Sequence, residues 1–205
     1  MGKRLASEGA PSSKIASFGG SSRVLSRAFW ASGVKTLASS IITTLPFEEY
    51  GFKDLIVDIN SMGDKETRPA FIKELTNYYK KHLESLCKDC HERIKTNPLR
   101  LLDCKQPECQ PFKEGSPSSL SFLSNDARHH FTEVLQYLEE MGIAYRVNNS
   151  LVRGLDYYSR TVFEVIKIDV DEDGKEKEIT ITDGGRYDYL ANMMGCKKDV
   201  PGVGT

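Results

Sequence analysis

Toward the C-terminus, apolar and polar positions alternate as they do in β-strands. Residues 161–168, TVFEVIKI, are rich in β-branched and aromatic side chains, and residues 178–182, EITIT, alternate strictly. The polar run DEDG at 171–174 favours a turn between them. The pattern predicts a hairpin, which would bring the segments 151–160 and 184–188 to one end of a sheet.

Residues 51–59 show a similar alternation, with apolar side chains at Leu55, Val57 and Ile59 beside charged neighbours. We predict a half-exposed strand here. The run NSMGD at 60–64 then favours a turn or loop.

Helical spacing replaces this alternation in the middle of the chain. Apolar residues recur every three or four positions from Phe71 to Leu86. Pro69 stands where a first helical turn would begin, and Thr67 or Arg68 precedes it. We therefore predict a core-facing helix that reaches about Cys87.

Two further helices are expected downstream. A short one covers residues 90–95. A longer one is capped by Asn125 or Asp126 and ends just before Gly142. Residues 115–121, rich in serine and proline, form a loop between them.

Two adjacent histidines, His129 and His130, lie in the longer helix. Successive residues of a helix point in different directions, so this pair does not converge on one ligand. We interpret both as surface or internally satisfied side chains.

The composition excludes some classes of protein. With 205 residues, the chain can bury a substantial core as one domain or two small ones. Its net charge is −1, so bulk charge does not indicate nucleic-acid binding, and any RNA contact requires a local basic patch. No apolar run is long enough to span a membrane.

Residues 1–46 differ from the rest of the chain. They contain six lysine or arginine residues and a single acid, Glu8, whereas the remainder has 22 basic and 28 acidic residues. Two interpretations compete: a disordered basic tail, or an organelle targeting peptide, which has the same arginine- and serine-rich composition.

Five cysteines without a secretion signal are typical of a reducing compartment, where thiols stay free or bind metal. Cys87 and Cys90 form a CxxC pair, and Cys104 and Cys109 follow within a short distance. Two close pairs separated by a short helix can give a tetrahedral four-thiolate zinc site. The alternative is four free thiols that are partly buried. A redox role is not favoured, because no strand-to-helix pattern leads into the CxxC, and Cys196 stands alone.

The two segments at the predicted end of the sheet are polar. Residues 151–158, LVRGLDYY, combine an arginine, a glycine, an acid and two tyrosines, and residues 184–188, GGRYD, add a second arginine and a third tyrosine. Guanidinium groups bind carboxylates and phosphates through two parallel hydrogen bonds. The combination suits a small ligand that carries both charges, with a phosphate nearby.

These segments resemble the histidine-specific signatures of the histidyl-tRNA synthetases, which are class II aminoacyl-tRNA synthetases. RGLDYY, followed by TVFE at 161–164, resembles the first signature element, and GGRYD resembles the second. NPLRLLDCK at 97–105 is similar to the segment that leaves the helical insertion of bacterial-type members. GFKDL at 51–55, continuing into 60–64, is similar to a fourth segment. The resemblance covers about residues 47 to 204 in the family's order.

The resemblance implies an α+β fold that forms part of an antiparallel-sheet catalytic domain with a helical insertion. Residues 47–64 and 143–205 would belong to the catalytic core, and residues 65–142 to the insertion, which in the family approaches the acceptor end of the tRNA. Basic residues of the insertion would contact phosphates, although interleaved acids also fit a solvated surface of mixed charge. They are Lys80, Lys81, Lys88, Arg93, Lys95, Arg100 and Lys105.

The family activates histidine with ATP and Mg²⁺, forming histidyl-adenylate, and transfers it to tRNA(His). By resemblance, Arg153 sits against the histidine carboxylate and the α-phosphate, where a fixed guanidinium stabilises the transition state. Gly154 lets the backbone come close. The implied histidine-pocket residues are Tyr157, Tyr158 and Tyr187, whose phenols can hydrogen-bond an imidazole. Supporting roles fall to Asp156, Glu164, Gly184, Gly185 and Arg186.

The chain departs from the family pattern at both ends. The first two class II motifs are missing upstream of residue 51, and a faint likeness to the second at 29–35 has Ala31 and Lys35 where the family has glutamine and glutamate. Residues 1–46 are therefore also interpretable as a frame-shifted or decayed start. The chain ends before the third motif with its ATP-binding arginine, and before the anticodon-binding domain. The resemblance leaves open whether the chain is active alone.

The main interpretation is a catalytic-domain fragment of this family that acts in the cytoplasm, or in an organelle if the N-terminal segment is a transit peptide. The resemblance also implies a homodimer. Two alternatives stay open. One is a non-catalytic relative that senses histidine, such as the regulatory subunit of ATP phosphoribosyltransferase, although such relatives lack the tRNA-facing insertion. The other is a zinc-stabilised RNA-binding module.

Overall fold

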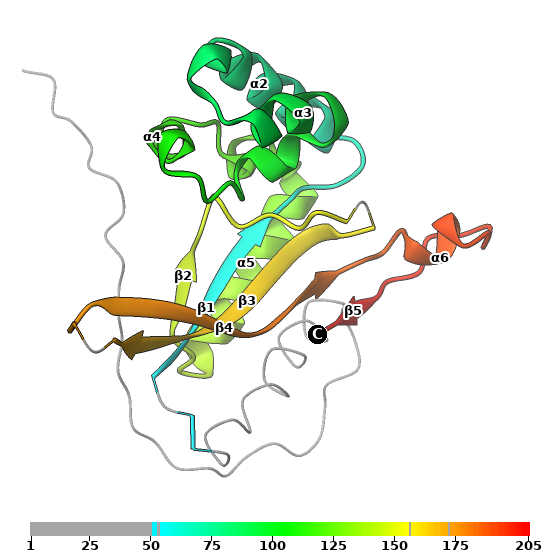
Figure 1. Ribbon diagram of the computed structural model, residues 1–205. Coiled ribbons are helices and arrows are strands. Elements are labelled where there is room, and N and C mark those ends of the chain that lie inside the picture. The colour runs from blue at the N-terminus through cyan, green and yellow to red at the C-terminus, as the bar shows by residue number, and fades with distance from the viewer. Residues whose placement is uncertain (1–50, 53, 156, 172) are drawn as a thin grey trace, which may run out of the picture.

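The computed structural model describes residues 51–205, except for residues 53, 156 and 172. The interpretations of residues 1–46 and of Asp156 therefore lie outside the described residues. The described part contains a five-stranded mixed sheet in the order β2-β1-β3-β4-β5, with helices on either side of it (Figure 1). In this part of the chain, no helix is long and apolar enough to cross a membrane.

The predicted hairpin is confirmed. It consists of β3 (Ser159–Val170) and β4 (Glu176–Arg186), which pair antiparallel at the centre of the sheet. Both strands are longer than predicted, so the glycines and the arginine of the GGRYD segment lie within β4 and not after it. The turn is closed by a hydrogen bond from the Gly174 amide to the Asp171 carbonyl at 3.0 Å.

The other strands complete a mixed sheet around this hairpin. β1 (Leu55–Ser61) pairs antiparallel with β3. The short edge strand β2 (Tyr145–Val147), which the sequence pattern did not reveal, runs parallel to β1. On the opposite edge, β5 (Val203–Gly204) pairs antiparallel with β4.

A strand was predicted at 51–59 and is present from Leu55, but the prediction that it is half-exposed was wrong. β1 continues through Asn60, where a turn was expected, and most of it is buried on both faces. Its polar side chains Asp58 and Asn60 are only 4% and 0% exposed. The Arg146 guanidinium donates to both carboxylate oxygens of Asp58, at 2.7 and 2.9 Å. The Asn60 amide donates to the Leu151 carbonyl at 3.0 Å. These partners let the polar face be buried.

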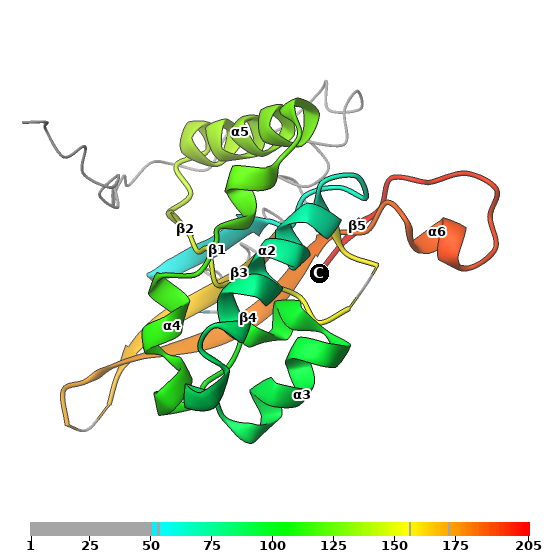
Figure 2. The same cartoon turned by 90° about the horizontal axis from the view of Figure 1, so that it is seen from above.

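Helices lie against opposite faces of the sheet (Figure 2). α5 (Asn125–Glu140) packs on one face. On the other lie α2 (Arg68–Lys80), α3 (Lys88–Thr96) and α4 (Pro111–Glu114). The segment 65–142 is thus divided between the two faces. We call the α2–α4 part the helical subdomain.

Short helices connect these elements. The 3-10 helices are Leu83–Ser85 (η2), Pro98–Leu101 (η3), Pro107–Cys109 (η4) and Ser119–Phe122 (η5). η5 falls partly within the predicted loop at 115–121. α6 (Leu190–Met193) lies in an arm between β4 and β5 that extends away from the end of the sheet (Figure 1).

α2 begins as predicted but ends early. Thr67 is its N-cap residue and Pro69 stands in its first turn. The helix stops at Lys80 and does not reach Cys87. Leu83, which continued the helical spacing, is 37% exposed. The chain turns there, so spacing alone overestimated the helix.

α5 differs from the prediction at its first turn. Its N-cap is Ser124, whose hydroxyl accepts a hydrogen bond from the Ala127 amide at 3.1 Å, and not Asn125 or Asp126. Its end is confirmed by Gly142, which lies just past the helix with φ +69°.

Candidate functional site

The hairpin brings the two signature segments together at one end of the sheet. In the β3–β4 register, Ser159 pairs with Arg186. Nearby, the ring centroids of Tyr157 and Tyr158 are 4.8 Å apart, and the Tyr187 ring lies edge-on to both, at 6.2 and 6.5 Å. These separations are typical of packed aromatic side chains. The three predicted tyrosines therefore form one cluster.

Arg153 lies beside this cluster. Its guanidinium carbon is 5.5 Å from the centroid of the Tyr158 ring, within reach of a cation–π contact. It donates to the Glu164 carboxylate at 3.1 Å and to a carboxylate oxygen of Asp183. Burial raises the pKa of the Glu164 carboxyl, although the Arg153 guanidinium opposes this shift and Asp183 adds to it. Two carboxylates thus fix the direction in which the guanidinium points.

Asp183 was not among the site residues predicted from the sequence. It stands directly before the GGRYD segment, and the β3–β4 register places it opposite Glu164. The position of the turn alone could not have revealed this pairing. Counted from the turn, residue 182 would stand opposite residue 164, and a register shift between Val165 and Ile166 moves Asp183 there instead. Two acids that face each other need a cation between them.

Asp188 holds the second arginine. Its carboxylate oxygens accept hydrogen bonds from Arg186 Nε at 2.8 and 2.7 Å, and both side chains are largely buried. The Asp188 amide in turn donates to the Ser159 hydroxyl at 3.0 Å. The second signature segment is therefore tied to the start of β3.

Close packing explains two of the signature glycines. A Cβ atom at Gly184 would lie 2.7 Å from the ring of Phe163 and would also collide with the carbonyl of Gly204. A Cβ atom at Gly185 would lie 2.9 Å from a backbone oxygen of β3. At Gly154 the nearest atom would be 3.7 Å away, so no contact among the described residues requires glycine there.

Replacing Gly184 by alanine is expected to destabilise the fold by about 2–3 kcal/mol, because β5 or the Phe163 ring must move. Gly154→Ala is the matched control and should change stability by no more than about 0.5 kcal/mol. Urea unfolding of both variants measures the difference. Equal losses of stability would contradict the close β4–β5 packing.

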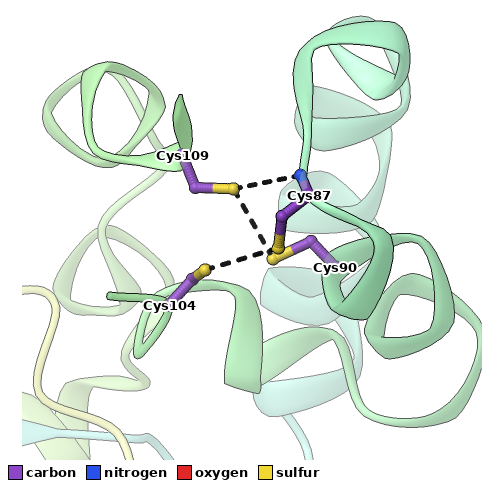
Figure 3. A group of neighbouring side chains, drawn as sticks. All are labelled: Cys87, Cys90, Cys104 and Cys109. Atoms are coloured by element: carbon purple, nitrogen blue, oxygen red, sulfur yellow. Dashed lines mark hydrogen bonds between the residues drawn. The ribbon is translucent and has the colours of Figure 1, made fainter. Parts of the chain in front are cut away.

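The four cysteines singled out by their spacing converge in the helical subdomain (Figure 3). Their sulfur atoms all lie within 4.8 Å of one another. The Cys87 and Cys104 sulfurs are 3.8 Å apart, and those of Cys109 and Cys90 are 3.9 Å apart. A disulfide needs about 2.05 Å. A tetrahedral zinc ion with Zn–S bonds of about 2.3 Å would set sulfurs about 3.8 Å apart. The geometry therefore fits a four-thiolate metal site.

The surroundings of these sulfurs agree with that fit. Cys90, Cys104 and Cys109 are buried, whereas Cys196 is exposed and apart from them. Burial raises the pKa of the Cys90 thiol, and raises that of the Cys109 thiol to about 11. Such thiols ionise readily next to a positive charge, which a divalent cation among them would supply.

The basic side chains of the helical subdomain lie mostly at its surface. Of the seven singled out above, Arg93 alone is partly buried, and it donates to the Arg100 carbonyl at 3.3 Å. Lys95 pairs with Glu92 at 3.0 Å. The remaining basic side chains are exposed, although acids lie between them in the sequence.

Comparisons with known proteins agree on one family. No model of a protein family matches the chain. The chain is 43% identical over 155 residues to a histidine–tRNA ligase of Solidesulfovibrio magneticus, a match that covers 75% of this chain and 35% of the relative. It is 37% identical over 171 residues to the histidine–tRNA ligase of Bacillus subtilis, covering 83% and 38%. The crystal structure of apo S. aureus histidyl-tRNA synthetase matches with a TM-score of 0.56 and 27% identity, over 81% of this chain and 38% of that one.

The mixed sheet, its helices and the likeness to the S. aureus structure define an α+β fold of the class II aminoacyl-tRNA synthetase catalytic domain, as predicted. The relatives then specify the family. Over the matched residues, the chain belongs to the histidine–tRNA ligases. It spans little more than a third of the length of these curated relatives.

Proposed function

We propose that this chain supplies the histidine-binding part of a histidine–tRNA ligase, which activates histidine with ATP and Mg²⁺ and transfers it to tRNA(His). The observation that supports this function is the convergence of Arg153 with three tyrosines at the end of the hairpin. The names of the relatives supply the reaction. Because the chain spans about a third of their length, the reaction as a whole is proposed by analogy.

Arg153 is proposed to bind the histidine carboxylate and the α-phosphate of ATP. Negative charge gathers on that phosphate as the carboxylate attacks it, so a fixed guanidinium acts most strongly in the transition state. Glu164 and Asp183 hold Arg153 in place, so little orientational freedom is lost when the ligand binds. Gly154 and Asp156 are proposed to support this segment.

The tyrosine cluster is proposed to receive the imidazole side chain. Tyr158 is only 8% exposed, and burial raises the pKa of its phenol although Arg153 opposes the shift. The phenol therefore stays protonated and can donate a hydrogen bond to an imidazole nitrogen. Tyr157 and Tyr187 would form the other walls of the histidine pocket. Gly184 and Gly185 would allow β5 and β3 to pack closely against β4 beside this pocket.

We also propose that Cys87, Cys90, Cys104 and Cys109 hold a structural zinc ion. The ion would tie α3 to the turns around η3 and η4, which carry these cysteines. A structural site of this type takes all four positions of zinc and leaves none for catalysis.

Three further proposals rest mainly on the family. The exposed basic side chains of the helical subdomain contact phosphates near the acceptor end of the tRNA. The protein assembles as a homodimer. It acts in the cytoplasm.

Binding of L-histidine to the purified chain, measured by calorimetry, tests the proposed site. Arg153→Ala should weaken binding by about 10- to 100-fold, because the carboxylate loses charge-assisted hydrogen bonds. Arg153→Lys keeps the charge but loses the two-pronged geometry, so it should give an intermediate loss. Arg128→Ala, an exposed arginine on α5, is the matched control and should leave binding unchanged.

Thermal unfolding shows which variants fold, so a loss of affinity is scored only for folded protein. No binding by a folded parent chain would contradict the proposed site, and unchanged binding in Arg153→Ala would contradict the role of Arg153. Histidine-dependent ATP–pyrophosphate exchange then tests activation. Histidine binding without exchange fits a catalytic-domain fragment of the family as well as a histidine-sensing relative, and salt-dependent tRNA binding without either favours an RNA-binding module.

A further inference from the structure

His130 is a buried link between α5 and β4. His130 is only 5% exposed, and Arg186, which lies against it, is 7% exposed. Arg186 Nη1 is 3.0 Å from His130 Nε2. His129, the preceding residue on the helix, is instead exposed and lies near Glu133. Of the two adjacent histidines, one is therefore a surface residue and the other joins helix to sheet.

The chemistry of this contact determines the state of the ring. Arginine can only donate hydrogen bonds, so Nε2 of His130 must accept. A ring nitrogen accepts only in the neutral form, and the ring proton then sits on Nδ1. Nδ1 is buried and has no hydrogen-bond partner among the described residues. Protonation at Nε2 would break this hydrogen bond, because an N–H of His130 would then face an N–H of Arg186.

The contact continues to the tyrosine cluster. Arg186 also donates to the Asp188 carboxylate, which accepts a further hydrogen bond from the Gly202 amide at 3.4 Å. Between them, the Tyr187 amide donates to the Gly202 carbonyl at 2.9 Å. Through Asp188 and Gly202, these hydrogen bonds connect the Tyr187 backbone to the Arg186 guanidinium.

We propose that His130 is a positioning residue of this site: its neutral ring accepts a hydrogen bond from Arg186 and thereby holds the segment that carries Tyr187 against the other two tyrosines. The proposal rests on the proposed function only in that Tyr187 is a wall of the histidine pocket. The hydrogen-bonded link itself is independent of the ligand.

The charged groups around the ring make its neutral state pH-dependent. Arg186 on β4 and Arg160 on β3 disfavour a second positive charge, whereas Asp188 beyond β4 and Asp126 on α5 favour it. Burial, followed by the two arginines, lowers the pKa of His130 from 6.5 to about 4. The folded pKa lies below the unfolded one, so the link is at full strength above pH 6.5 and weakens as the pH falls toward 4.

Hydrogen exchange of peptides from residues 186–204 tests the link. Between pH 7.5 and 5.0, after correction for intrinsic exchange, opening of this segment should become roughly 30-fold more favourable in the parent chain, as the two pKa values require. His130→Gln offers an amide oxygen to Arg186 at every pH and should remove this dependence while keeping protection. His130→Leu should lose protection equally at both pH values. His129→Gln is the matched control and should behave like the parent.

Histidine affinity measured on the same variants separates this proposal from the proposed function. At pH 7.5, His130→Leu should bind histidine more weakly while His130→Gln and His129→Gln bind like the parent. An undiminished pH dependence in His130→Gln, or full protection in His130→Leu, would overturn the role of His130. If exchange behaves as expected but no variant binds histidine, the link stands and the proposed function fails.

Discussion

Serine in place of Cys104 is expected to lower the free energy of unfolding by at least about 4 kcal/mol, which corresponds to a fall in Tm of roughly 10 °C for a chain of this size. Zinc-finger peptides bind their metal with roughly 10–16 kcal/mol, so a loss of this size is a fraction of what a four-thiolate site can contribute. The elements tied together are short: α3 has 9 residues and η4 has 3. Helices of this length are not stable in isolation.

Metal analysis and thermal unfolding of the same samples check this prediction. The parent chain should contain one zinc ion per molecule, and chelation should bring its Tm close to that of Cys104→Ser. Cys196→Ser is the matched control, because that cysteine is exposed and outside the cluster. It should change stability by no more than about 0.5 kcal/mol. A zinc-free parent chain whose stability equals that of Cys104→Ser would end the zinc proposal.

Methionine in place of Arg146 is expected to cost about 3–5 kcal/mol, because it leaves the Asp58 carboxylate buried without its counter-charge. The Asp58 side chain is only 5% exposed, and its remaining side-chain partner is Asn148, which donates at 2.7 Å. The effect should extend to the site, since this pair anchors the segment that leads into Arg153. Urea unfolding measures the loss of stability.

The other partner of Arg146 provides the control. Glu178, which Arg146 contacts at 2.9 Å, is about half exposed, so Glu178→Gln should cost no more than about 1 kcal/mol. Replacing Asp58 by asparagine together with Arg146→Met removes the unpaired charge and should recover part of the stability. If Arg146→Met and Glu178→Gln cost the same, burial of Asp58 is not what makes this ion pair important.

Much of the local structure followed from the sequence. The hairpin, the start of α2 at Pro69 and the end of α5 at Gly142 depend on backbone preferences and short-range periodicity, which act on neighbouring residues. The convergence of Cys87 with Cys90 follows from a spacing of one helical turn. The family followed from the order of four segments. No single residue type carried it.

The tertiary structure decided which polar residues are buried and what they touch. Asp58 looked like the exposed side of a strand, yet Arg146 from a later strand covers it. His130 and His129 are neighbours of the same type, and only the packing of α5 on the sheet separates their roles. Asp183 reaches Arg153 because of a strand register that depends on the whole hairpin.

The sequence by itself therefore determined the central hairpin, the presence of the longer helices, the family and most residue types of the site. The tertiary structure alone decided that Arg153 is held by two carboxylates, that Arg186 contacts the buried His130 ring, and that four sulfurs lie at the spacing of a tetrahedral metal site. The physical reason is that periodicity reports contacts within a turn or a strand pair. Burial and hydrogen-bond partners are set by elements that are distant in the sequence and meet only in the folded chain.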